Sequence, residues 1–184
     1  TEVVPSEDAV AILGALERCR GLDLADLSVP GVVLAAELED CTLHRTDLTG
    51  ARIHTGLRGR GDGVVLSGAN LTGCTIKLAG DGIRLDGAAA SHGRLLLLNG
   101  AQLSAAGLTA QWCRLGRVNL PGADLQGADL TGSSAGPGIG LRGARLSGAC
   151  FRGVDLPDAC LIGADLRAVS YTHLRAHETG WYLV

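Results

Sequence analysis

The stretches NLPGADLQGADLTG (residues 119–132) and LRGARLSGACFRGVDLPDACLIGADLR (141–167) decide the fold of this 184-residue chain. Leucine or phenylalanine recurs at every fifth position in both stretches. A small residue stands two positions before most of them, and Asp, Asn, Arg or Cys usually stands directly before. A period of five fits neither an amphipathic helix, which repeats every ~3.6 residues, nor a strand, which alternates every two. The sequence therefore predicts a coil in which each pentad forms one side.

Within one side, alternation directs the small residue and the leucine inward and the residue between them outward. The two remaining positions, rich in Gly, Ser, Thr and Arg, make the turn to the next side. Four sides close a square, so positions about twenty residues apart stack and their backbones pair. The predicted central ladder is Leu43, Leu48, Ile53, Leu66, Leu71, Ile76, Leu103, Leu108, Leu120, Leu125, Leu130, Leu141, Leu146, Phe151, Leu156, Leu161 and Leu166, with Ala123, Ala128, Ala144, Ala149, Ala159 and Ala164 as the small inward residues.

Three stretches shift the phase of the repeat, and each must hold inserted or deleted residues at a corner: 54–65, 78–100 and 131–140. In the last of them Pro137 lies between two glycines, a pattern typical of a bulging turn. With one residue inserted there, the spacing predicts two interior ladders, Leu120–Leu141–Leu161 and Leu125–Leu146–Leu166.

The pattern A-(D/N)-L-x-x resembles that of the pentapeptide-repeat proteins, over roughly residues 21–168 and most strongly at 119–167. The resemblance implies an all-β solenoid, a right-handed quadrilateral parallel β-helix. The best-known role that it implies is binding of DNA gyrase by mimicry of duplex DNA, which gives quinolone resistance or toxin immunity.

Residues 5–20 predict a short α-helix. Ser6 can cap its start, Arg18 and Arg20 suit its end, and the apolar residues follow helical spacing. An open end of a β-helix exposes unpaired strands, so we expect residues 1–20 to cap the repeats, with partner binding by this helix as the alternative.

Residues 169–184 abandon the repeat. The peptide VSYTHLRAHET (169–179) resembles, residue for residue, the translation of a constant transposase adapter used to prepare sequencing libraries. We therefore predict a non-native tail at 169–184 after a β-helix at 21–168, and a chain that is a fragment of a bacterial protein of metagenomic origin. On this interpretation His173 and His177, four residues apart, hold no metal.

Four aspartates in outward slots, Asp124, Asp129, Asp155 and Asp165, raise the alternative of a carbohydrate-active enzyme, because paired carboxylates cleave glycosides. No histidine or tyrosine accompanies them, and the native part offers only Trp112 and Phe151 for stacking on a sugar. We therefore expect no enzyme, no catalytic residue and no cofactor.

The six cysteines form no C-x-x-C motif and have no histidine at ligand spacing, so neither a metal site nor a disulfide framework is expected. Free thiols favour a reducing compartment, and we predict a cytoplasmic protein whose N-terminus is incomplete. Cys41 and Cys74 should take inward slots. Cys150 and Cys160 should lie on opposite sides of the coil and remain unpaired. No apolar run approaches the length of a membrane span.

These observations favour a non-enzymatic scaffold or protein-binding module whose partner is another protein, with no direct binding of nucleic acid or membrane. Gyrase binding is the alternative, and it requires a continuous acidic face. The acidic excess lies elsewhere, since residues 1–50 carry a net charge of −7 and the rest +4. The regular coils carry Arg142, Arg145, Arg152 and Arg167, and the outward column Asp124–Arg145–Asp165 alternates in sign.

Overall fold

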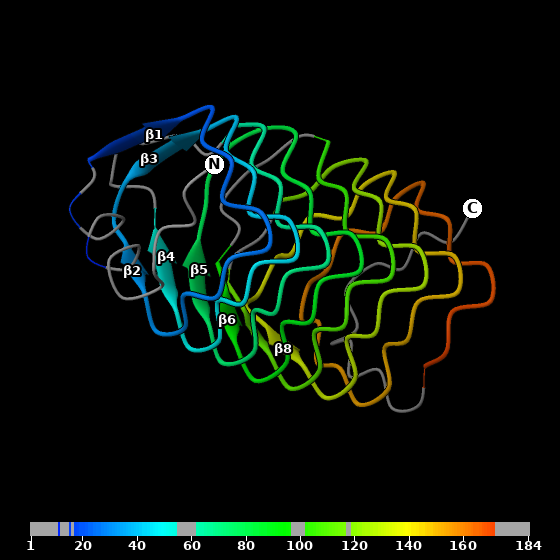
Figure 1. Ribbon diagram of the computed structural model, residues 1–184. Helices are drawn as coiled ribbons and strands as arrows, with labels where there is room; N and C mark the ends of the chain where they lie inside the picture. The colour runs from blue at the N-terminus through cyan, green and yellow to red at the C-terminus, as the bar shows by residue number, and fades with distance from the viewer. Residues whose placement is uncertain are drawn as a thin grey trace.

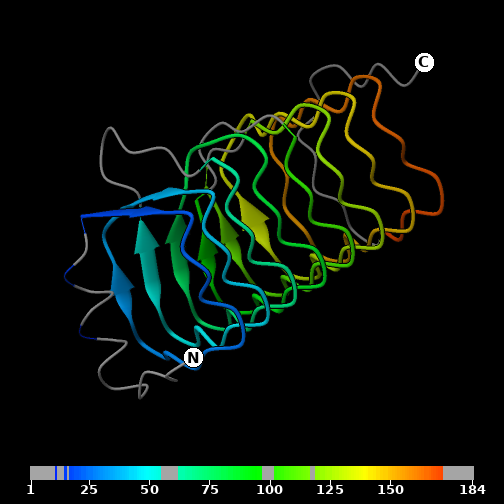
Figure 2. The same cartoon turned by 45° about the horizontal axis from the view of Figure 1, so that its top comes forward.

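A computed structural model of the chain describes residues 11, 15, 17–54, 62–96, 102–116 and 119–171. The chain winds into a parallel β-solenoid, whose coils stack side by side along one axis (Figure 1). Seen from nearer the end, each coil has the outline of a quadrilateral (Figure 2). The predicted fold class, a parallel β-helix built from short sides, is confirmed.

The strands are short because each spans one side of the coil. Six of them form a parallel sheet in the order β2-β4-β5-β6-β7-β8, and β1 pairs with β3 in a second sheet. Isolated parallel bridges hold the other sides together. The strands are β1 (Arg18–Arg20), β2 (Val33–Leu34), β3 (Glu37–Glu39), β4 (Arg52–His54), β5 (Thr75–Lys77), β6 (Arg94–Leu95), β7 (Arg114–Leu115) and β8 (Ser134–Ala135).

The register of the regular coils follows the predicted ladders. Asp124 bridges Arg145, which bridges Asp165, and the same stacking continues through the adjacent leucines. The N–H of Leu125 donates to the carbonyl of Arg145 at 2.8 Å, and that of Leu146 to the carbonyl of Asp165 at 2.9 Å. The step from 124 to 145 exceeds the step from 145 to 165 by one residue, which confirms the insertion expected near Pro137.

Each corner is a tight turn that requires a left-handed residue. In the turn after Leu125, the N–H of Ala128 donates to the carbonyl of Leu125 at 3.1 Å, and Gly127 has a φ of 64°. A positive φ at the third residue is the geometry of a type II turn, which favours glycine. Eight described residues other than glycine also adopt a positive φ: Asp26, Asp40, Arg45, His92, Gln102, Trp112, Asp158 and Ala168.

Leu103 and Leu108 do not lie in the central ladder, contrary to the sequence prediction. Both are buried, but Ser104 bridges Arg84 and Asp124, so the position that stacks with the central leucines is Ala105. Leu103 instead takes the other inward slot, and the same holds for Leu108. The error arose because Leu-x-Ala and Ala-x-Leu place similar volumes inside the coil, so spacing alone does not separate them.

The remaining predicted interior residues face the bore. Those with at most 6% of their surface exposed are Leu43, Leu48, Ile53, Leu66, Leu71, Ile76, Ala123, Leu125, Ala128, Leu120, Leu130, Leu141, Ala144, Leu146, Ala149, Phe151 and Leu156. Ala159, Leu161, Ala164 and Leu166 are half-buried and pack against this core from the last described coil.

Every element with described bounds is a strand, and the capping helix predicted at 5–20 is not seen as an element, although Ala11 and Ala15 are described as helical. Most of its residues fall outside the described part, and its expected end is wrong, because Arg18–Arg20 is strand β1. Alternation explains the strand: Cys19 points inward between two exposed arginines and pairs with Leu38. At the other end, Ser170 still bridges Cys150, and the rest of the predicted tail beyond Tyr171 lies outside the described residues.

Candidate protein-binding faces of the coil

The outward slots stack into columns, one on each face of the coil. We name three of them by their residues. Face 1 carries Asp23, Thr42, Val65, Arg84, Ser104, Asp124, Arg145 and Asp165; face 2 carries Ser28, Asp47, Asn70, Ala89, Thr109, Asp129, Cys150 and Ser170; face 3 carries Val33, Arg52, Thr75, Arg94, Arg114, Ser134 and Asp155.

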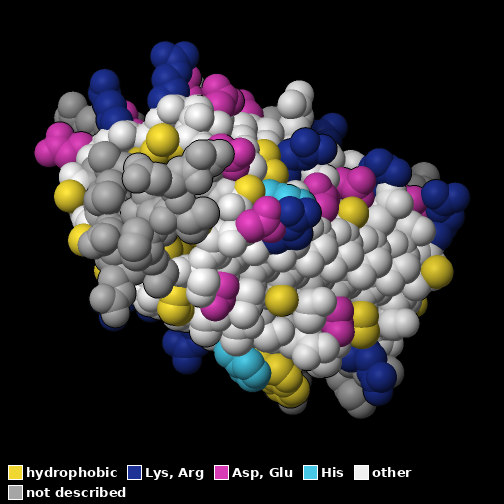
Figure 3. All heavy atoms as spheres, viewed as in Figure 1, with side chains coloured by type: hydrophobic (Ala, Val, Ile, Leu, Met, Phe, Trp, Pro, Cys, Tyr) yellow, Lys and Arg dark blue, Asp and Glu magenta, His cyan; other side chains and the backbone are white. Residues whose placement is uncertain are grey.

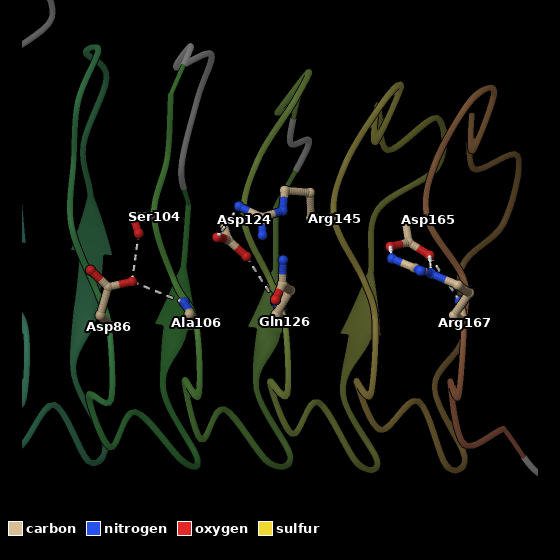
Figure 4. A network of polar contacts seen from close by, with 8 residues as sticks. All are labelled: Asp86, Ser104, Ala106, Asp124, Gln126, Arg145, Asp165 and Arg167. Atoms are coloured by element: carbon tan, nitrogen blue, oxygen red, sulfur yellow. Dashed lines mark hydrogen bonds and ion pairs between the residues drawn. The ribbon is translucent and has the colours of Figure 1, made fainter.

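On face 1 the aspartates of the regular coils form ion pairs with nearby arginines (Figure 4). An Nη1 of Arg145 lies 3.1 Å from Oδ2 of Asp124 on the preceding coil. Asp165 instead binds Arg167 of its own corner, with an Nη2–Oδ2 distance of 2.7 Å. The view in Figure 3 likewise shows Lys and Arg side chains interspersed with Asp and Glu on the visible surface, with no continuous acidic band.

The outward aspartates also stabilise the corners. The backbone N–H of Gln126 donates to Asp124, that of Thr131 to Asp129, and that of Arg167 to Asp165, at 3.0–3.2 Å. A carboxylate that accepts the N–H two residues onward forms an Asx-turn, which accounts for aspartate before the central leucine. Hydrogen bonds from the Arg167 side chain and backbone lower the pKa of Asp165 to about 2, so its charged form is strongly favoured.

The four candidate carboxylates do not converge. Asp129 lies on face 2 and Asp155 on face 3, while Asp124 and Asp165 share face 1 with Arg145 between them. Glycoside cleavage needs two carboxyl groups that flank one bond. Asp129 and Asp155 lie on different faces, and Arg145 stands between Asp124 and Asp165, so these four carboxylates do not form such a pair.

The six cysteines are free. Cys41, Cys74 and Cys113 are buried in the small inward slot, where the thiols of the last two donate to the carbonyls of Leu48 and Ala90 at 2.7 Å. Burial raises the pKa of Cys74 to about 11, which suppresses its thiolate.

Cys150 and Cys160 are half-buried and belong to different columns, since Cys150 stacks on Asp129 and Cys160 on Gly140. Within the described ranges no three His, Cys, Asp or Glu side chains gather closely enough to hold a metal ion. The histidines at 173 and 177 lie outside those ranges.

The character of face 3 was not predicted from the sequence: among the described residues, its arginines stack without forming an ion pair to an acid. Arg52, Arg94 and Arg114 are exposed and occupy one column, with Thr75 between the first two. The corner beside this face carries Trp112, which is 60% exposed. The signal was the arginine directly before an inward aliphatic residue at 52, 94 and 114, but the three could be placed in one column only with the correct register through residues 78–110.

Residues 111–135 and 141–170 match the sequence model of pentapeptide repeats, in eight copies. These residues are pentapeptide repeats. The upstream coils share their backbone pairing and corner geometry, although their sequences are more degenerate. Among the residues that the structure describes, no helix is long and apolar enough to cross a membrane.

Several solved structures of pentapeptide-repeat proteins are similar to this chain. A trypsin-treated variant of QnrB1, a plasmid-mediated fluoroquinolone resistance protein, is 16% identical with a TM-score of 0.45, over 86% of this chain and 90% of that one. HetL from the cyanobacterium Nostoc, which is involved in the regulation of heterocyst differentiation, is 20% identical with a TM-score of 0.20, over 92% and 94%. Rfr23 from the cyanobacterium Cyanothece is 16% identical with a TM-score of 0.20, over 85% and 88%. No curated protein matches the sequence.

Proposed function

We propose that this pentapeptide-repeat chain is a non-enzymatic scaffold that binds another protein through the outer faces of its coil. The observation that carries the proposal is the filling of the interior by aliphatic side chains along the described coils. The buried polar side chains of this core, Thr46 and Ser133, donate to the carbonyls of Leu24 at 2.8 Å and Ala110 at 2.6 Å. The groups available for recognition therefore lie in the outward columns.

Such columns suit protein recognition because they are regular and rigid. Neighbouring rungs lie about 4.8 Å apart, and the backbone of each is hydrogen-bonded to the coils on both sides. A partner that docks on a rigid surface orders few side chains, so less of the interaction free energy is lost to entropy. The six free thiols are compatible with a reducing compartment, and we propose a cytoplasmic setting.

Gyrase binding by DNA mimicry is the alternative raised by the family resemblance. The ion pair between Arg145 and Asp124 opposes it, because a partner that binds duplex DNA requires an uninterrupted negative potential. We expect the purified chain at micromolar concentration neither to inhibit gyrase nor to protect it from a quinolone in a supercoiling assay. Protection that weakens steeply with added salt would establish the alternative.

The scaffold proposal is tested by photo-cross-linking from one outward position on each face: Ser104 on face 1, Asn70 on face 2 and Thr75 on face 3. The expected result in lysate of a bacterial host is a saturable adduct of one mass from one face, removed by excess unlabelled protein. Weak, unsaturable labelling of equal strength from all three faces would contradict the proposal.

A further inference from the structure

The following inference rests on the proposed scaffold function and names its docking surface. We propose that face 3 is the binding surface and that its partner is an acidic segment of another protein, held by Arg52, Arg94 and Arg114 and anchored beside Trp112.

The charges of face 3 stack in register. Arg52 pairs with Thr75, Thr75 with Arg94, and Arg94 with Arg114, through β4, β5, β6 and β7. Arg94 and Arg114 are therefore direct neighbours, about 4.8 Å apart at the backbone. Lys77, two residues after Thr75 in β5, adds a fourth positive charge and pairs with His54.

Within the described coils the arginines of face 3 form no ion pair with an acid; Arg84 on face 1 forms none either, but on face 3 two such arginines, Arg94 and Arg114, stack directly on one another. Two other arginines have a carboxylate on a neighbouring coil: Arg18 lies 2.8 Å from Glu37, and Arg45 lies 2.6 Å from Asp26. The acid in this column, Asp155, is separated from Arg114 by Ser134.

Like charges stacked on neighbouring strands destabilise a sheet, so this column carries a repulsion that the fold does not require. Glutamate at either Arg94 or Arg114 would remove it, as acids do at β3 against β1. An acidic partner would also remove it, and bound carboxylates would find guanidinium groups already exposed and in line.

Trp112 is an independent sign of binding on the adjoining corner. Its φ is 56°, a left-handed conformation that a bulky residue adopts at a cost, and glycine fills the corresponding corner position at Gly132. The indole lies against Gly132, where a Cβ would overlap the ring. Tryptophan and arginine dominate the binding energy of protein interfaces, and here they stand two residues apart.

The dimensions of the surface favour a peptide segment over a polynucleotide. The arginine column is one side chain wide, and face 2 beside it carries Asp47 and Asp129. A nucleic acid backbone is negative along its whole length and would meet these carboxylates as well. From Arg52 to Arg114 is three rungs, about 14 Å, which a short acidic segment can span.

The test measures binding of fluorescein-labelled deca-glutamate to the full chain by fluorescence anisotropy, at low and at moderate salt. We expect saturable binding that the double charge reversal Arg94→Glu/Arg114→Glu weakens by about tenfold or more. The matched control is Arg84→Glu/Arg142→Glu, which makes the same charge change at exposed positions on face 1 and on the corner before it, and should alter affinity by less than about twofold.

Trp112→Gly separates binding from folding. Glycine suits the positive φ, so the melting temperature should hold or rise while the affinity falls by about threefold or more. Equal weakening by the two double variants, unchanged affinity in Trp112→Gly, or no peptide binding would each overturn the assignment of face 3.

Labelled decathymidylate serves as the competing probe. Tighter binding of this oligonucleotide with the same dependence on the variants would make face 3 a nucleic-acid surface and overturn the proposal. A saturable cross-link from Asn70 or Ser104 without peptide binding would overturn the role of face 3 while the scaffold function stands. Loss of cross-linking from all three positions would instead contradict the scaffold function.

Discussion

The coils around residues 41–85 pack more tightly than the coils around 120–156, although the second group has the cleaner repeats. Leu66 and Leu85 have none of their surface exposed, whereas Leu120 and Leu125 retain 5% and 6%. A wholly apolar cavity of about 40 Å³ lies in the bore of the later coils. Its lining residues are Leu95, Leu103, Leu108, Leu115, Leu120, Leu125, Leu130, Ile139, Leu141, Phe151 and Leu156.

The difference comes from the small inward slot. In the earlier coils it holds residues larger than alanine at several positions, such as Cys41, Val64 and Cys74, whereas the later coils hold Ala123 and Ala128. An interior that lacks partner atoms loses dispersion contacts, so alanine beside leucine leaves the later bore underfilled. A regular repeat therefore indicates a regular backbone, whereas the volume of the side chains in the inward slots determines how tightly the core is packed.

The largest expected effect is that of a charge placed in the bore. Leu146→Asp should unfold the C-terminal coils, because an unpaired buried carboxylate costs several kcal/mol. Arg145→Asp, one residue away on the exposed face, should change the free energy of unfolding by less than ~1 kcal/mol. Urea denaturation measures both, and equal losses would disprove the alternation of inward and outward residues.

A matched pair of larger side chains tests the difference in packing. Leu71 and Leu130 lie in equivalent central positions, since Asn70 and Asp129 belong to the same column. Leu71→Phe should destabilise the tight coil by about 1–3 kcal/mol through overpacking. Leu130→Phe can extend into the cavity, so its cost should be under ~1 kcal/mol. The comparison fails if thermal and urea unfolding show the same loss for both variants.

The smallest expected effect concerns the corners. Asp158→Gly should stabilise the chain by about 0.5–1 kcal/mol, because the aspartate has a φ of 55° that glycine adopts without strain. Gly143→Ala is the control: open space surrounds this position, so its loss of about 1 kcal/mol would come from the positive φ of 65° alone. A stabilising Gly143→Ala would show that the corners do not require left-handed residues.

Much of this fold could be predicted from the sequence because period, alternation and stacking are coupled. Once Leu120 and Leu141 are placed inside, the outward position of Arg145 follows. The register between 78 and 110 could not be predicted, since at 103–105 and 108–110 Leu-x-Ala fills the bore as well as Ala-x-Leu would, and the arginine column of face 3 depends on that register. The helix boundary at 18–20 failed because Arg18 and Arg20 suit both a helix end and an exposed strand edge.

Labelling of the native cysteines tests the central claim, the division of the coil into a closed bore and exposed faces, most directly. The structure predicts that Cys150 and Cys160 react with a maleimide in the folded chain at pH 7, because both are partly exposed. Cys74 and Cys113 should react only after unfolding, since both are buried and burial raises the pKa of each thiol. Mass spectrometry of the labelled peptides reads each site separately. Labelling of Cys74 or Cys113 in the folded chain as fast as that of Cys150 would contradict the closed bore.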